Sequence, residues 1–129
     1  MSQTSPTESS AVVLFGHGAR DPEWAGPVRR IRERLLAQPD APQVELAFLE
    51  FMQPTLPEAI ATLAAAGARH IAVVPIFLAQ GGHLKRDLPL LLDEVRQAHP
   101  QCTIDLATAA GEADPVVAAM AEYARSCVS

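Results

Sequence analysis

The chain has few of the features that mark membrane, secreted or nucleic-acid-binding proteins. Its apolar runs all fall short of the roughly 20 residues that a membrane helix needs. Its polar start, MSQTSPTESS, contains no apolar core of a signal peptide. The two cysteines, Cys102 and Cys127, have no metal-type spacing, so reduced thiols are expected. A formal net charge of −5 argues against nucleic-acid binding. We therefore expect a cytoplasmic protein that binds neither a membrane nor a nucleic acid.

Three common functional motifs are also absent. The segment GHGARD, residues 16–21, is neither a Walker loop nor a GxGxxG dinucleotide fingerprint. No GxSxG nucleophile elbow occurs anywhere in the chain. An RHG phosphohistidine motif would need arginine where Gly16 stands. Nucleotide-binding, serine-hydrolase and phosphohistidine chemistry are therefore not predicted.

Four short apolar runs alternate with four helical patterns. Strands are expected over residues 11–15, 43–49, 70–75 and 103–107. The first helix is expected over residues 24–37. The second begins after Thr55, which has Glu58 at capping-box spacing, and ends at Gly67. The third and fourth are expected to begin after N-cap residues Asp87 and Asp114. The residues expected on their buried faces are Val28, Ile31 and Leu35; Ile60, Leu63 and Ala64; Leu88, Leu91, Leu92 and Val95; and Val116, Val117, Met120 and Ala124. We also expect Trp24, Tyr123 and Met52 to be packing residues.

This alternation predicts an α/β fold, because strands that alternate with helices form a parallel sheet covered by helices on both faces. A length of 129 residues suits one domain. We predict one three-layer domain over residues 11–129, preceded by a disordered lead over residues 1–10. Its four-stranded sheet is expected in the flavodoxin-like order 2-1-3-4. Ligands in such sheets bind beyond the carboxyl ends of the strands, where the order reverses, here between strands one and three.

Two histidines beside glycines follow the strands that flank this point. The motif GHG, residues 16–18, ends the first strand, and GGH, residues 81–83, lies in the expected loop after the third. Glu50 follows the second strand at the same edge. Imidazole and carboxylate are ligands for divalent metals, and both can accept protons. Glycines permit unusual backbone angles and close approach of the main chain to a ligand.

Simpler explanations of these residues stay open. A histidine beside glycine is often a turn or surface residue, and Glu50 could be a solvated loop acid. Arg20 could form a turn ion pair with Asp21, which would contribute little energy. His70 and His99 are expected to be structural, since His70 begins a strand and His99 ends a helix, where a cation suits the helix dipole.

Three segments together resemble the small class II chelatases called CbiX and SirB. They are GHGARDP (residues 16–22), FLEFMQPTLPEAI (48–60) and VVPIFLAQGGHLKRDLP (73–89). The resemblance runs from about residue 12 to residue 95 and is weaker toward the C-terminus. Ala19 stands where the family usually has serine, which is not generally regarded as a metal ligand.

The resemblance implies a chelatase-like fold and a site. His17 and His83 take the positions of metal-binding and proton-accepting histidines, and Glu50 that of an acid used in metal delivery or proton handling. The resemblance also implies a backbone edge that meets the substrate, formed by Leu78, Ala79, Gln80, Gly81, Gly82 and His83. Independently of the resemblance, Arg20, Lys85 and Arg86 lie in the same loops, and their positive charges could meet the carboxylates of the substrate. The chain resembles the short forms, which pair as homodimers. A second copy would supply the second wall that a tetrapyrrole needs.

The implied activity is that of a lyase-type sirohydrochlorin chelatase. It would insert Co²⁺, Fe²⁺ or Ni²⁺ into the tetrapyrrole without ATP or any cofactor beyond the metal substrate. Cobalamin and sirohaem biosynthesis are both open as pathways. Two alternatives remain: a metal carrier or sensor that uses the same histidines without tetrapyrrole turnover, and a degenerate domain that only dimerises.

Overall fold

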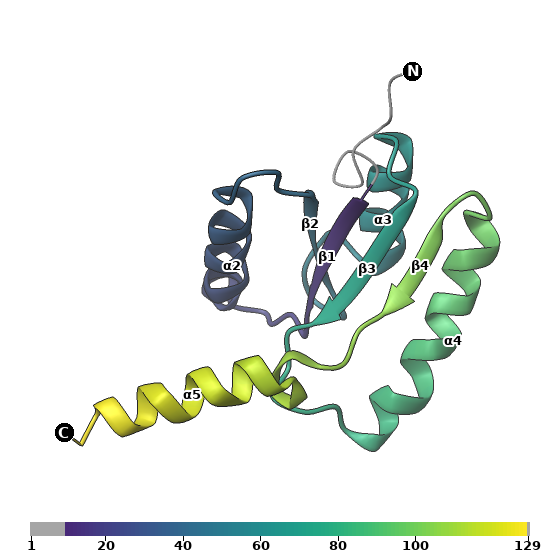
Figure 1. Cartoon of the computed structure of the whole chain (residues 1–129). Coiled ribbons are helices and arrows are strands. Elements are labelled where there is room, and N and C mark those ends of the chain that lie inside the picture. The colour runs from purple at the N-terminus through teal and green to yellow at the C-terminus, as the bar shows by residue number, and fades with distance from the viewer. Residues whose placement is uncertain (1–9, 129) are drawn as a thin grey trace.

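The computed structural model describes residues 10–128, apart from the side chain of His83 (Figure 1). Its four strands are β1 (Ser10–Gly16), β2 (Gln43–Phe48), β3 (His70–Pro75) and β4 (Thr103–Leu106). They form one sheet in the order β2-β1-β3-β4, and all neighbouring pairs are parallel. The predicted order 2-1-3-4 is therefore confirmed. The expected disordered lead lies outside the described residues, except for Ser10, which begins β1.

The helices follow the predicted alternation, with three differences at their starts. They are η1 (Pro22–Ala25), α2 (Gly26–Leu36), α3 (Leu56–Ala65), α4 (Gly82–Ala98), η2 (Ala110–Glu112) and α5 (Asp114–Ser126). The first predicted helix begins as a short 3₁₀ turn, capped by the Asp21 carboxylate, which accepts a hydrogen bond from the Glu23 N–H at 3.0 Å. The last begins at Asp114 itself, so its N-cap is Ala113.

The third predicted helix begins six residues earlier than expected. Asp87 is not its N-cap, because α4 starts at Gly82 and Gly81 is the capping residue. Pro89 consequently lies inside α4 rather than in its first turn. The error arose because Gly-Gly and Pro are poor helix formers, so their local signals indicated a loop. In the folded chain the turns of α4 are set by packing of Leu88, Leu92 and Val95 into the core.

The main core lies between the sheet and helices α3 and α4. Alternate residues of β1 and β3, among them Val13, Phe15 and Ile71, are fully buried on this face. Their alternation follows from the two-residue period of a strand. The predicted faces of α3 and α4 pack against them, and both faces are buried or half-buried as expected. The Thr55–Glu58 capping box that starts α3 is also confirmed.

The opposite face of the sheet is only partly covered. A smaller cluster joins Val28 of α2 to Leu14, Leu46 and Phe48, and half-buried Met52 packs against it as expected. Toward β3 this face has no comparable layer within the described part of the chain, and helix α5 projects away from the body of the domain (Figure 1). Helices therefore lie on both faces of the sheet as predicted, with α3 and α4 on one and α2 on the other, but the cover of the α2 face is incomplete toward β3.

The predicted burial of the α5 face is wrong, because this helix projects away from the domain. No residue of α5 is buried, although Val116, Val117, Met120 and Ala124 share one side of the helix. Tyr123 is 72% exposed and Trp24 is 71% exposed, so neither is the packing residue expected. Periodicity identifies the apolar side of a helix but does not identify what packs against it. None of the helices within residues 10–128 is long and apolar enough to span a membrane.

The contrast between buried and exposed leucines of α4 gives a test of this core. Leu92→Ala should lower the free energy of unfolding by about 2–5 kcal/mol, because it leaves a cavity in the main core. Leu90→Ala, on the same helix but 64% exposed, should change it by no more than about 0.5 kcal/mol. Urea unfolding followed by circular dichroism measures both. Equal losses would contradict the packing of Leu92 against the sheet.

Candidate functional site

The carboxyl ends of β1, β2 and β3 are joined by backbone hydrogen bonds beyond the sheet itself. The Leu49 N–H donates to the Gly16 carbonyl at 3.0 Å, and the Glu50 N–H donates to the His17 carbonyl at 3.2 Å. On the other side of β1, the Ile76 N–H donates to the Phe15 carbonyl at 2.8 Å. The loops that carry the predicted site residues therefore begin in close contact at one edge of the sheet.

The second glycine of the GHG motif is required by this contact. Gly18 has φ +83°, and a Cβ there would collide with the backbone carbonyl oxygen of Glu50. Gly18 thus lets the loop after β1 lie against the loop after β2, which brings the backbones of His17 and Glu50 together. Gly16, Gly81 and Gly82 do not have positive φ, so unusual backbone angles are confirmed for Gly18 alone of these four.

The imidazole of His17 packs on an aromatic ring from the neighbouring loop. Its centroid lies 4.9 Å from that of Phe77, with 50° between the ring planes. Phe77 is buried and also contacts Phe15, so it forms a fixed support, whereas His17 is exposed to solvent. This arrangement leaves the imidazole accessible on the side away from Phe77. The site therefore has one histidine held at the switch point between β1 and β3.

An open cavity of about 370 Å³ surrounds this histidine. The described residues that line it come from four segments and are Gly16, His17, Gly18, Trp24, Pro27, Val28, Phe48, Ile76, Phe77, Leu78 and Ala79. Apart from His17 the walls are apolar or backbone. Sequence reasoning missed Trp24, Phe77 and Ile76 as wall residues. For two of them the sequence contained an indication, because Ile76 and Phe77 directly precede Leu78, the first residue of the segment expected to contact the substrate.

Glu50 and Arg20 lie on the rim formed by the first two loops. Both side chains are exposed. The Arg20 guanidinium carbon lies 5.1 Å from the centroid of the Phe51 ring, a cation–π geometry. Phe51 has φ +68°, an uncommon conformation for a residue with a Cβ. The loop after β2 therefore holds this ring beside the arginine. The alternative of an Arg20–Asp21 ion pair is not found among the described residues.

His83 lies outside the expected loop. It is the second residue of α4, and its side chain is not among those that the structure describes. Lys85 and Arg86 follow it on exposed positions of the same helix, and the Lys85 N–H donates to the Gly81 carbonyl at 3.0 Å. Among the side chains described, no three His, Cys, Asp or Glu residues are grouped to hold a metal. The site of His17, His83 and Glu50 thus stays a prediction.

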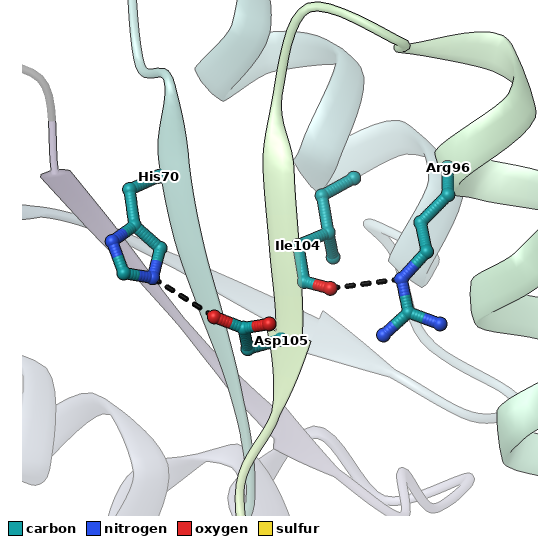
Figure 2. A network of polar contacts seen from close by, with 4 residues as sticks. All are labelled: His70, Arg96, Ile104 and Asp105. Atoms are coloured by element: carbon teal, nitrogen blue, oxygen red, sulfur yellow. Dashed lines mark hydrogen bonds and ion pairs between the residues drawn. The ribbon is translucent and has the colours of Figure 1, made fainter.

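The other two histidines lie elsewhere in the fold. His70 is at the opposite end of β3 from the candidate site, and its Nε2 is 3.0 Å from Oδ2 of Asp105 on β4 (Figure 2). Both side chains are largely exposed, so this ion pair contributes little to stability. On the other side of β4, the Arg96 Nε–H of α4 donates to the Ile104 carbonyl at 2.8 Å (Figure 2).

His99 is the C-cap residue of α4. Like His70, it is distant in the fold from the carboxyl ends of β1 and β2, where the candidate site lies.

A family comparison covers nearly the whole described chain. The model of the CbiX family matches residues 11–127. The sirohydrochlorin cobaltochelatase of Methanopyrus kandleri is 45% identical over 82 residues, which are 64% of this chain and 57% of that protein. The matched part thus spans little more than half the length of this relative.

Two solved structures share the fold. The CbiX protein of Marinobacter aquaeolei VT8 superposes with a TM-score of 0.79 over 92% of this chain and 97% of the other, and at 24% identity it is similar in fold alone. The sirohydrochlorin chelatase SirB of Bacillus subtilis subspecies spizizenii, crystallised with cobalt, is 29% identical with a TM-score of 0.75. The match covers 92% of this chain but 50% of SirB.

The contact between the first two loops can be tested with two glycines. Gly67→Ala places a Cβ at φ +98° in open space, so it should cost about 1–2 kcal/mol of unfolding free energy from backbone strain. Gly18→Ala adds the collision with the Glu50 carbonyl to the same strain and should cost distinctly more. Thermal unfolding of the two variants makes the comparison. If Gly18→Ala were the milder change, the two loops could not be in contact.

Proposed function

Since the chain belongs to the CbiX family, we propose that it is a sirohydrochlorin chelatase that inserts a divalent metal ion into the tetrapyrrole without ATP. The observation that carries this proposal is the position of His17. An accessible imidazole lies at the reversal of strand order, supported by Phe77 at 4.9 Å and surrounded by apolar walls. Such a place combines a metal ligand and base with a surface that suits a flat ring.

The reaction requires a ligand and a base at one face of the macrocycle. The metal loses water as it enters, and two pyrrole N–H protons leave, so that M²⁺ and the free ring give the metal complex and two protons. We assign to His17 the roles of metal ligand and proton acceptor, from which protons pass to solvent. His83 is proposed as the second ligand, and Glu50 as an acid that binds the metal or relays a proton. Holding metal and ring together would supply much of the rate increase.

The substrate surface follows from the same geometry. We propose that the macrocycle lies against the apolar walls around His17 and meets the segment from Leu78 to His83. Leu78 is 74% exposed and is therefore available for such a contact. Arg20, Lys85 and Arg86 would meet the peripheral carboxylates of the ring. Because the chain has a net charge of −5, this attraction must be local.

Cobalt and ferrous iron are the proposed metal substrates, with nickel third. The named cobaltochelatase relative and the SirB crystal with cobalt support testing cobalt first. Nitrogen and carboxylate ligands do not by themselves separate these ions, because each accepts the same donor types. The corresponding pathways are cobalamin biosynthesis for cobalt and sirohaem biosynthesis for iron, and we propose that the reaction takes place in the cytoplasm.

We also propose that two copies of the chain form a homodimer around the tetrapyrrole. One domain of this fold supplies one wall beside His17. The match to SirB covers 92% of this chain but only 50% of SirB, so that chain has room for a second unit of similar size. A second copy of the present chain would take that place, related by a twofold axis.

The activity is tested by an anaerobic absorbance time course of sirohydrochlorin with Co²⁺ or Fe²⁺ and no nucleotide. The wild-type chain should accelerate the spectral change, and His17→Ala should lower the rate by about 100-fold or more, the usual effect of losing a proton-transfer group. His83→Ala should also lower it strongly. His70→Ala is the matched control and should leave the rate unchanged, because His70 lies at the other end of β3.

Two results would contradict this proposal. If the wild-type chain is no faster than the protein-free control with cobalt, iron and nickel, the chain is not a chelatase. Metal binding without metallated product would then favour the carrier or sensor, and binding of neither metal nor ring would favour a degenerate domain. If His70→Ala is impaired and His17→Ala is not, the site has been assigned to the wrong end of the sheet.

The contact with substrate carboxylates has a separate test. Arg20→Ala should raise the apparent KM for sirohydrochlorin about tenfold, the effect of one charged contact of roughly 1.5 kcal/mol, with a smaller change in kcat. Arg29→Ala on α2 removes an exposed arginine outside the candidate site and serves as control. An equal change in KM for both variants would show that only the overall charge matters.

A further inference from the structure

The segment between β3 and α4 carries part of the candidate site but has no regular structure of its own. It runs over residues 76–81. It contains Phe77, which supports the imidazole of His17, and Leu78, the first residue of the expected substrate edge. Leu78 is largely exposed, so its side chain does not anchor the segment. The shape of the site therefore depends on what holds the backbone of residues 76–81 in place.

Backbone hydrogen bonds hold this segment from two sides. On one side the Ile76 N–H donates to the Phe15 carbonyl of β1. On the other side the Gly111 N–H donates to the Phe77 carbonyl at 2.8 Å. Gly111 belongs to η2, the short turn between β4 and α5, in the connection that passes the carboxyl end of β3 (Figure 1). A turn from the C-terminal part of the chain is thus bonded directly to the residue that supports His17.

Gly111 lies closer to the segment than a residue with a side chain could. A Cβ at this position would collide with the carbonyl oxygen, the Cα and the carbonyl carbon of Leu78. The backbone angle of Gly111 does not require glycine, since its φ is not positive. A Cβ on Gly81 or Gly82, in the same expected substrate edge, would meet nothing within 4 Å. The requirement for glycine therefore comes from the contact between the backbones of η2 and Leu78.

The turn that carries Gly111 is a fixed part of the fold. Ala109, which precedes η2, is 2% exposed and belongs to the same buried cluster as Phe77. The Glu112 N–H donates to the Ala109 carbonyl at 2.9 Å and closes the turn. Because η2 is anchored in the main core, it can hold the less regular segment beside it in one position.

The segment itself has space around it. Leu78 lines both the cavity of about 370 Å³ around His17 and a neighbouring apolar groove of about 660 Å³ over β1 and β3. A Cβ added at Gly111 would therefore displace the exposed segment toward these hollows rather than the buried turn. Phe77 and Leu78 would then change their position relative to His17.

We propose that Gly111 is a positioning residue for the chelatase site. It contacts neither the metal nor the reacting atoms. It fixes the backbone of Phe77 and Leu78, so that the imidazole of His17 and the edge that meets the macrocycle keep their relative position. The inference rests on the function proposed above, and it assigns a role in that site to a part of the chain that carries none of its chemical groups.

Histidine NMR signals of the protein without metal or substrate test this positioning directly. The imidazole of His17 lies beside the Phe77 ring, so the chemical shifts of its ring protons depend on the distance and tilt between the two rings. These signals should move in Gly111→Ala, whereas the signals of His70 and His99 should not. The spectrum of His17→Ala identifies the signals of His17.

Binding of the ring tests whether the position matters for function. Gly111→Ala should raise the dissociation constant of metal-free sirohydrochlorin about tenfold and lower kcat/KM for metal insertion about 10- to 100-fold, since a misplacement of about 1 Å can cost a factor of about 100. Gly67→Ala is the matched control, because its Cβ enters open space at the other end of β3. It strains the backbone without reaching the site, and its dissociation constant should stay within about twofold of wild type.

Hydrogen exchange of the wild-type chain provides a test that needs no substitution. The Gly111 N–H is bonded to the segment that is proposed to meet the ring, so added sirohydrochlorin should slow its exchange with deuterium. The Ala68 N–H, which donates to the Leu63 carbonyl before the amino end of β3, should exchange at an unchanged rate. A Gly111 amide whose exchange the ring leaves unchanged would contradict the proposal, even if Gly111→Ala fails to fold.

The remaining outcomes separate this inference from the function on which it rests. Unchanged His17 signals in a folded Gly111→Ala variant refute the positioning, whatever the metal-insertion assay shows. A folded variant that binds the ring as tightly as wild type refutes the role of Gly111 in the site. If the wild-type chain binds no sirohydrochlorin, the proposed function is wrong, and the His17 signals alone then decide whether Gly111 sets the position of the histidine.

Discussion

β1 pairs in parallel with both β2 and β3, and this pairing sets where the loops of the candidate site begin. Because β1 is central, its carboxyl end is hydrogen-bonded on each side, and the bonds continue past the strands at Gly16, His17 and Phe15. The loops after three strands therefore start from one edge. The position of His17 against Phe77, and the approach of the Glu50 backbone, are consequences of that pairing.

The two faces of the sheet perform different tasks. The face beneath α3 and α4 contains most of the fully buried side chains and accounts for the stability of the domain. The other face is covered by α2 over part of its width and leaves an apolar groove that joins the cavity at His17. The well-packed face thus supports a partly open face, and the loops that carry His17 start from this scaffold.

Much of the candidate site could be predicted because its signals are local. The residues of GHGARDP and GGH follow strands whose order is a common one, so the strand order is enough to place His17 and Glu50 at one edge. Trp24 and Phe77 could not be assigned in this way. Their role depends on which loops face each other, and the sequence alone supports a packing role for any aromatic residue equally well. The start of α4 was misjudged because Gly81, Gly82 and Pro89 are weak helix residues whose conformation is decided by packing of the helix.

The strands, the apolar sides of the helices, the capping box at Thr55 and the family resemblance could all be predicted from the order of the amino acids. These depend on spacing between near neighbours, which a linear chain records directly. Three features became evident from the folded chain: Gly18 must lack a side chain, His17 packs on Phe77, and α5 projects away from the sheet. Each of these depends on contacts between segments far apart in the chain. Amphipathic spacing predicts which side of a helix is apolar. Which segments pack against that side depends on the three-dimensional path of the chain.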